Sequence, residues 1–228
     1  MISFLSQTYW ILTKDLKIEF RELYHLISVF LFGFLLLILL SFSLGSHPDL
    51  MKKIAPGLFW IAIFFSSILM LNSSFRREME DGQWEGLLLL SIDPKALYLG
   101  KLLGNFLFLL VLEIGLLPFL VIFFDLSLNP SLLSILILGS AGIATVGTFY
   151  AGLITSFREG QILLPLLLFP MLVPVLLASV QATQYLMTDD PFGQQIIWVR
   201  LLIVFDFIFL LGSILLADLM FEEPQGGK

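Results

Sequence analysis

Six long apolar segments dominate the pattern of hydrophobic and polar positions along the chain. They cover residues 26–44, 57–71, 97–124, 132–157, 161–180 and 196–220. A helix needs about 20 mostly apolar residues to cross a hydrocarbon core. Five segments come close to or exceed that length, and the second has room to extend because it lies between Lys53 and Arg76. The pattern predicts an all-α integral membrane protein with six transmembrane helices.

Residues 1–24, ahead of the first span, show a different pattern. Their apolar side chains recur every three or four positions, at Leu5, Tyr9, Leu12, Leu16, Phe20 and Leu23. This is the spacing of one helical face, and charged residues occupy much of the remainder. We expect an amphipathic helix that lies in the membrane interface with its apolar side toward the acyl chains. The charged stretch is too long for a cleavable signal peptide.

The distribution of basic residues predicts the orientation of the chain. With the N-terminus inside, nine of the 12 lysines and arginines fall in cytoplasmic segments, and the outer segments hold Lys52, Lys53 and Arg200. Short cytoplasmic loops carry such an excess of basic residues. We therefore expect both termini in the cytoplasm.

Composition supports the membrane assignment and excludes several functions. Apolar residues make up 58% of the chain and charged residues 13%, a balance that a soluble domain of this size could not bury. The net charge of −6 argues against a nucleic-acid partner. The chain has no cysteine and two histidines, which excludes disulfides, thiolate metal sites and a histidine-rich metal cluster.

The stretch between the second and third spans is the most distinctive polar segment. Its charged part reads RREMEDGQWEG over residues 76–86, and an apolar run follows at once. Asp93 and Pro94 have the pattern of an N-cap and a first helical residue, which predicts the start of the third helix. A short cytoplasmic helix in residues 77–91 would suit a docking element. The alternative is a charged loop that only fixes the topology.

Two motifs resemble the CcmB family, the haem exporter permeases of cytochrome c maturation. The first is the acidic motif EDGxxExLLL at residues 80–89, and the second is the proline-bearing stretch LFPMLVPV at residues 168–175. The length, the six-span layout, the short turn at Arg158 and Gly160 and the amphipathic N-terminus are also similar to that family.

The resemblance implies a fold, partners and a site. Such permeases have the six-helix fold of ABC-2-type exporters and work as dimers, each subunit docked to a cytoplasmic ATPase subunit, CcmA. They associate with CcmC and CcmD, and the assembly uses ATP to release the haem-loaded chaperone CcmE. By match to the motif, the residues in or beside the coupling helix would be Glu80, Asp81, Gly82, Glu85 and Leu88. The implied location is the bacterial inner membrane, with haem as a possible cargo and no cofactor or metal of the chain's own.

The sequence also indicates that this chain is not an enzyme by itself. It contains no Gly-x-x-x-x-Gly-Lys-Ser/Thr phosphate loop, so energy from ATP must arrive through a cytoplasmic contact. Two other functions remain open: an ABC-2-type permease for another hydrophobic or lipid-linked substrate, and a membrane scaffold that transports nothing.

Two carboxyl groups inside predicted spans are candidates for a pathway through the bundle. Glu113 lies in the middle of the third span and Asp206 inside the sixth, where a charge costs at least about 2.5 kcal/mol. Glu113 either marks a pathway or is a neutral side chain bonded to a neighbouring helix. Asp206 could pair with Arg200, although six residues is a poor separation for one helical face.

Prolines and small residues suggest where helices bend and where they approach closely. Pro165, Pro170 and Pro174 in the fifth span each remove a backbone donor, which indicates either a kink in a moving gate or a static bend. The fourth span is rich in glycine and alanine, including Gly139, Gly142 and Gly147. Such residues allow close helix packing, either within the subunit or at a dimer interface.

Overall fold

The computed structural model describes residues 4–21, 23–43, 48–80, 92–124, 129–154, 160–187 and 193–221, and these contain helices and no strand. The helices are α1 (Phe4–Arg21), α2 (Leu23–Ser43), α3 (Pro48–Glu80), α5 (Pro94–Phe124), α6 (Leu132–Ile154), α7 (Gly160–Met187) and α8 (Gln194–Leu215), followed by the short 3₁₀ helix η1 (Ala217–Phe221).

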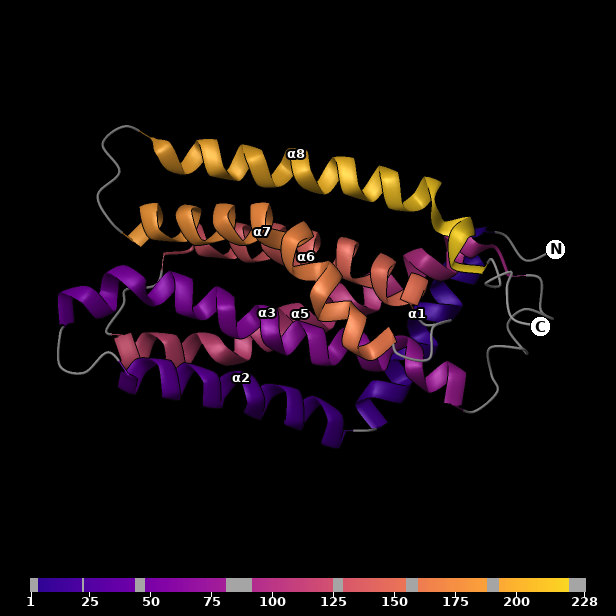
Figure 1. Cartoon of the computed structure of the whole chain (residues 1–228), viewed down its shortest axis with the longest axis horizontal. Coiled ribbons are helices and arrows are strands. Elements are labelled where there is room, and N and C mark those ends of the chain that lie inside the picture. Colours follow the sequence, from indigo (N-terminus) through magenta and orange to yellow (C-terminus); the bar gives the residue numbers. More distant parts are fainter. Residues whose placement is uncertain are drawn as a thin grey trace.

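The prediction of six membrane spans is confirmed. Within the described ranges, six helices (α2, α3, α5, α6, α7 and α8) are long and apolar enough to cross a membrane. They run side by side along the length of the molecule, and α1 lies across one end of the bundle (Figure 1). Helix α1 and η1, the first and last described helices, lie at that same end, as expected for an even number of spans.

Several predicted boundaries were wrong by a few residues. The N-terminal helix stops at Arg21, so Leu23 belongs to the first span rather than to the interfacial helix. Residues 77–80, assigned to the coupling segment, form the last turn of α3. The fifth span extends to Met187, and the sixth ends at Leu215. Helices α3 and α7 continue beyond the expected bounds, whereas α1 and α8 end before them.

Helices α3 and α6 form the centre of the bundle, and α2 and α8 lie at its periphery. The glycines of α6 explain its central place. A Cβ on Gly139 would overlap the ring of Trp60 on α3, and a Cβ on Gly147 would overlap the side chain of Leu71. Without side chains at these positions, the two helices approach closely. The small residues of the fourth span therefore pack within the subunit.

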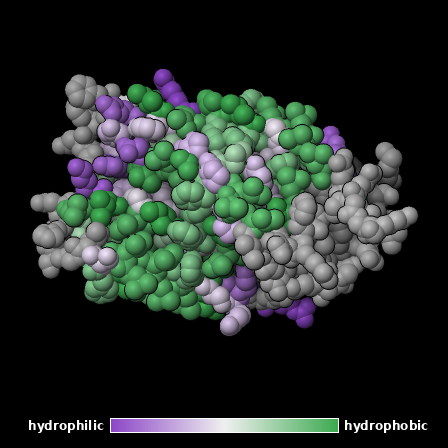
Figure 2. All heavy atoms as spheres, in the orientation of Figure 1, coloured by the Kyte–Doolittle hydropathy of each residue, from purple (hydrophilic) through white to green (hydrophobic). Residues whose placement is uncertain are grey.

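The surface of the bundle is apolar, as a lipid environment requires. Hydrophobic residues cover most of the middle of the face seen in Figure 2. On α1 the predicted apolar face is exposed at Leu5 (77%), Tyr9 (67%) and Phe20 (60%). Its other members on α1, Leu12 and Leu16, are half-buried. Thr8, Ile11 and Glu19 are buried against the protein. Helix α1 thus directs apolar side chains away from the bundle and several polar ones toward it.

Candidate functional site

The coupling residues predicted from the acidic motif lie at or beyond the edge of the described structure. Glu80 is the last residue of α3, and its side chain is outside the described part. Asp81, Gly82, Glu85 and Leu88 fall in residues 81–91, also outside it. What the structure describes is the two helix ends that flank this segment, the C-terminus of α3 and the N-terminus of α5.

The start of α5 is held by a cap and by a contact with α1. The carboxylate of Asp93 accepts a hydrogen bond from the backbone N–H of Lys95 at 2.9 Å, and its carbonyl accepts one from Leu97 at 3.0 Å. The predicted N-cap is therefore confirmed, with Pro94 at the first helical position, where no N–H is needed. The backbone N–H of Asp93 donates to Oε1 of Gln7 on α1 at 3.1 Å.

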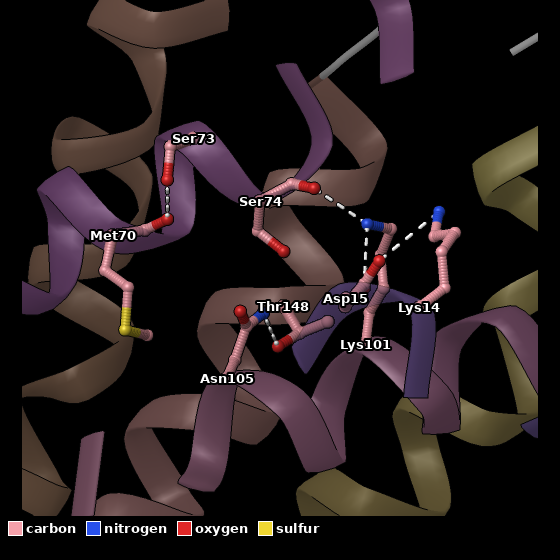
Figure 3. A network of polar contacts seen from close by, with 8 residues as sticks. All are labelled: Lys14, Asp15, Met70, Ser73, Ser74, Lys101, Asn105 and Thr148. Carbon is pink, nitrogen blue, oxygen red and sulfur yellow. Dashed lines mark hydrogen bonds and ion pairs between the residues drawn. The ribbon is translucent and has the colours of Figure 1, made fainter. Parts of the chain in front are cut away.

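One lysine connects α1, α3 and α5 near this end. The side chain of Lys101 is 2% exposed, and its Nζ donates to the carbonyl oxygen of Ser74 at 2.7 Å and to Oδ2 of Asp15 at 3.3 Å (Figure 3). The ammonium also lies 4.6 Å from the centre of the Phe75 ring. We call Lys101, Asp15, Ser74 and Phe75 the Lys101 junction. A buried ammonium is tolerable here because a carboxylate, a carbonyl and an aromatic face surround it.

Sequence reasoning identified Lys101 only as one of the basic residues that set the topology. Two features of the sequence could have indicated a buried ion pair. One is a lysine within an apolar run, and the other is an aspartate on the predicted interfacial helix. Neither could identify the other as its partner, since 86 residues separate them.

Polar contacts continue between α5 and α6 beyond the Lys101 junction. The amide of Asn105 donates to the hydroxyl of Thr148 at 2.9 Å (Figure 3), and the hydroxyl of Tyr98 donates to the carbonyl of Thr145 at 3.1 Å. All four residues are buried. These bonds fix the antiparallel register of the two helices.

Glu113 is fully buried between α5 and α6, at 0% exposure. The hydroxyl of Ser140 is its polar neighbour on α6, but within the described residues neither side chain reaches good hydrogen-bond geometry. A carboxyl group without a full set of partners is costly in a membrane interior. Glu113 therefore has a polar neighbour, but not the bonded partner that a purely structural role would supply.

Asp206 faces the opposite side of α6. A Cβ on Gly142 would lie 2.8 Å from its Oδ1, and among the described residues its carboxylate oxygens have no hydrogen-bond partner. The suggested pairing of Asp206 with Arg200 is wrong, because residues six apart on a helix point in different directions. Ser140 and Gly142 differ by about 200° around α6. Glu113 and Asp206 therefore lie at similar depth on different sides of α6 and do not form one cluster.

The three prolines of the fifth span lie within the single helix α7. Pro170 and Pro174 are exposed, whereas Leu164, Leu168 and Leu172 form the buried face. Pro170 and Pro174 thus occupy the outward side of α7, whereas Pro165 is half-buried. Whether they serve a moving gate stays a prediction.

In the part of the chain that the structure describes, no three histidine, cysteine, aspartate or glutamate residues come together as potential metal ligands. The polar features are instead an ammonium held between three helices and two separate carboxyl groups. The ammonium can hold three helices together, and the two carboxyl groups can bind a partner or a proton.

Comparison with known proteins gives a consistent result over most of the chain. The family model described as CcmB protein matches residues 6–219. Heme exporter protein B of Haemophilus influenzae is 28% identical over 188 residues, 82% of this chain and 85% of the relative. Heme exporter protein B of Pseudomonas aeruginosa is 27% identical over 191 residues, 83% and 86% of the two chains. The Escherichia coli K12 protein of the same name is 33% identical over 98 residues, 42% and 44% of the two chains.

Proposed function

Because the chain belongs to the CcmB protein family, we propose that it is the transmembrane permease subunit of an ABC complex serving cytochrome c maturation. The match across residues 6–219 carries this proposal, and the six-span architecture agrees with it. The chain would transmit energy from a separate ATPase to haem export or to the release of a haem-loaded chaperone.

The cytoplasmic contact would be made by residues 81–91 together with the adjoining end of α3. This segment connects the C-terminus of α3 with the N-terminus of α5, and both helices span the membrane. A displacement of the segment would therefore be transmitted to the bundle through both α3 and α5. Glu80, Asp81, Gly82, Glu85 and Leu88 would make the ATPase contact.

The proposed partners are a CcmA-like ATPase, CcmC-like and CcmD-like membrane proteins, and a CcmE-like haem chaperone, with a second copy of this chain in the complex. The proposed location is the bacterial inner membrane, with both termini cytoplasmic. The excess of basic residues in the inner segments supports this orientation. Helix α1 and η1, the first and last described helices, lie at the same end of the bundle, which agrees with both termini being on one side (Figure 1).

Purification of the tagged chain from its native membrane in mild detergent, followed by mass spectrometry, tests the proposal. We expect an ABC ATPase and a CcmC-like protein to co-purify. An ATPase without any cytochrome-maturation protein would favour a permease for another substrate. Absence of an ATPase, under conditions that preserve other membrane complexes, would contradict the proposed coupling.

A charge reversal tests the contact residues. We expect the double substitution Glu80→Lys/Glu85→Lys to abolish co-purification of the ATPase. Basic groups of the ATPase that bind these carboxylates would be repelled by the two introduced lysines. The variant should still fold, as judged by its detergent elution profile. Wild-type ATPase binding would mean that the contact lies elsewhere.

A further inference from the structure

Helix α1 is connected to both helices that flank the proposed coupling segment, and the connection is the Lys101 junction. We infer that Lys101 is a positioning residue that makes α1 move together with the end of α3 and the start of α5. This inference rests on the proposed function, because the movement is the one that the ATPase would drive. It assigns α1 a part in transmission beyond lying in the membrane interface.

Three contacts along one face of α1 hold it against α5. Near its N-terminus, Gln7 accepts the hydrogen bond from the backbone N–H of Asp93. At the middle of α1, the absence of a side chain at Gly100 of α5 allows the closest approach of the two helices. A Cβ at Gly100 would lie 2.7 Å from Cβ of Ile11 and 3.0 Å from the carbonyl oxygen of Thr8. Further along, Asp15 binds Lys101 at 3.3 Å. Helix α1 therefore lies along the first half of α5, as far as Phe108, whose ring centroid is 6.3 Å from that of Phe20.

The same lysine extends the connection to α3. Its ammonium donates to the carbonyl of Ser74 at 2.7 Å and lies over the ring of Phe75. Ser74 lies six residues before Glu80, where α3 ends. The ammonium of Lys101 thus connects α5, which follows the coupling segment, with α3, which precedes it.

Electrostatics explains why this junction resists separation more than an apolar contact would. If α1 moved away from α5, Asp15 would withdraw from an ammonium that is buried in the bundle. Separating such a pair leaves a charge without a partner in a medium of low dielectric constant. Apolar contacts between α1 and the bundle could be exchanged for lipid at little loss, since the opposite face of α1 is already apolar and exposed. The charge pair therefore prevents α1 from sliding freely in the interface.

Spin labels can test whether α1 moves with the bundle. The chain has no cysteine, so Lys17→Cys on α1 and Ser131→Cys at the start of α6 provide one labelled pair. Both side chains are exposed, and α1 does not pack against α6. With Lys101 intact, we expect one narrow distance distribution in the isolated chain. Lys101→Met keeps the length of the apolar side chain but removes the charge that binds Asp15. We therefore expect a broad distance distribution, because α1 is no longer held in one position.

Lys95→Met is the matched control on the same helix. Lys95 is 39% exposed and lies 4.0 Å from Asp218, so its loss should leave the distribution narrow. If Lys101→Met is as narrow as wild type, the junction does not hold α1 and the inference fails.

The coupling ratio of the assembled complex tests the role in transmission. We expect Lys101→Met to lower the haem-loaded chaperone released per ATP hydrolysed by about tenfold, a usual size for energetic coupling between two sites. Lys95→Met should leave that ratio unchanged. A purely structural defect would reduce release and hydrolysis in the same proportion, and an unchanged ratio would overturn the transmission role. If the wild-type chain binds no ATPase, the proposed function fails, whereas the label distances still decide whether the junction holds α1.

A second pair of variants tests the packing of α1 against α5 without changing any charge. Gly100→Ala places a Cβ against Ile11 and the backbone of Thr8, whereas Gly104→Ala places one 3.9 Å from Asp15 and Leu12, an ordinary contact. We expect Gly100→Ala to broaden the label distances and lower the coupling ratio, and Gly104→Ala to change neither. Equal behaviour of the two variants would overturn the inference.

Discussion

At the scale of single residues, the buried charged groups differ in how they are satisfied. Lys101 has a carboxylate, a carbonyl and an aromatic ring around it. The carboxylate oxygens of Glu113 and Asp206 are buried and form no hydrogen bond with the described residues. The first arrangement is typical of a fixed structural contact, and the second is typical of groups that change partners during function.

The Lys101 junction predicts an asymmetry between its two charged residues. Asp15→Asn should lower the stability of the chain by about 3 kcal/mol, because it leaves a buried ammonium without its counter-charge. Lys101→Met should have a smaller effect, since Asp15 is partly exposed and also contacts Lys14 at 3.3 Å. Adding Lys101→Met to Asp15→Asn should recover part of the loss. Thermal unfolding in detergent measures all three, with Lys14→Met as the control, and equal losses for both single variants would contradict this account.

Glu113 should matter for function more than an exposed acid does. Glu113→Gln keeps the size of the side chain but cannot carry a charge or release a proton. We expect it to reduce cytochrome c maturation, measured by haem staining in a complementation assay, by at least about tenfold. Asp218→Asn, on a side chain that is 63% exposed, should leave maturation near wild type. Equal activity of the two variants would mean that Glu113 is structural.

At the scale of elements, helix α6 is central because its small residues let four other helices approach it. Gly139 accommodates Trp60 of α3, Gly142 faces Val175 of α7 and Asp206 of α8, and Gly147 accommodates Leu71. Apolar side chains gain nothing by leaving lipid for another apolar surface, so close packing is what associates these helices.

The glycines of α6 should differ in their tolerance of alanine. Gly139→Ala meets the Trp60 ring, which is held by a hydrogen bond from its Nε1 to Thr183 at 3.1 Å. Gly147→Ala meets the end of the Leu71 side chain, which is more flexible than an indole ring held by a hydrogen bond. We expect Gly139→Ala to cost about 1–3 kcal/mol and Gly147→Ala less. Gly212→Ala, with no atom within 4 Å, is the control, and thermal unfolding that ranks Gly147→Ala as the more damaging would contradict this packing.

At the scale of the whole molecule, polar contacts connect α1, α3 and α5 at the end of the bundle where α1 lies (Figure 1). The capped start of α5 and the Lys101 junction are both there. If that end faces the cytoplasm, the elements that would receive the ATPase contact are also joined to one another by polar contacts. This arrangement suits transmission of a displacement into the bundle.

The orientation can be measured with single cysteines. In intact cells or spheroplasts, Ser131→Cys should react with a membrane-impermeant maleimide, because it begins α6 on the predicted outer side. Lys17→Cys should react only after the membrane is permeabilised, since α1 would lie on the cytoplasmic side. The chain has no other cysteine that could obscure the result. The reverse pattern would invert the proposed topology.

The number and type of helices could be predicted from the sequence because these depend on local pattern and on the solvent. Long apolar segments in lipid must form helices, since every backbone group needs a partner within the chain. The spacing of Leu5, Tyr9 and Phe20 likewise predicted an amphipathic helix, and these three side chains are exposed. The coupling role of residues 80–88 stays a prediction from the acidic motif, because most of them lie outside the described structure.

Only the tertiary structure decided which polar residues meet. Asp15 and Lys101 are partners because α1 lies along α5, and no pattern in either segment encodes that crossing. The same holds for Glu113 and Asp206, which look alike in the sequence and lie on different sides of α6. The hydrophobic pattern determines that a helix crosses the membrane, because lipid acts on each segment separately. The rotation and neighbours of that helix depend on close packing between segments far apart in the chain, which single-segment periodicity does not contain.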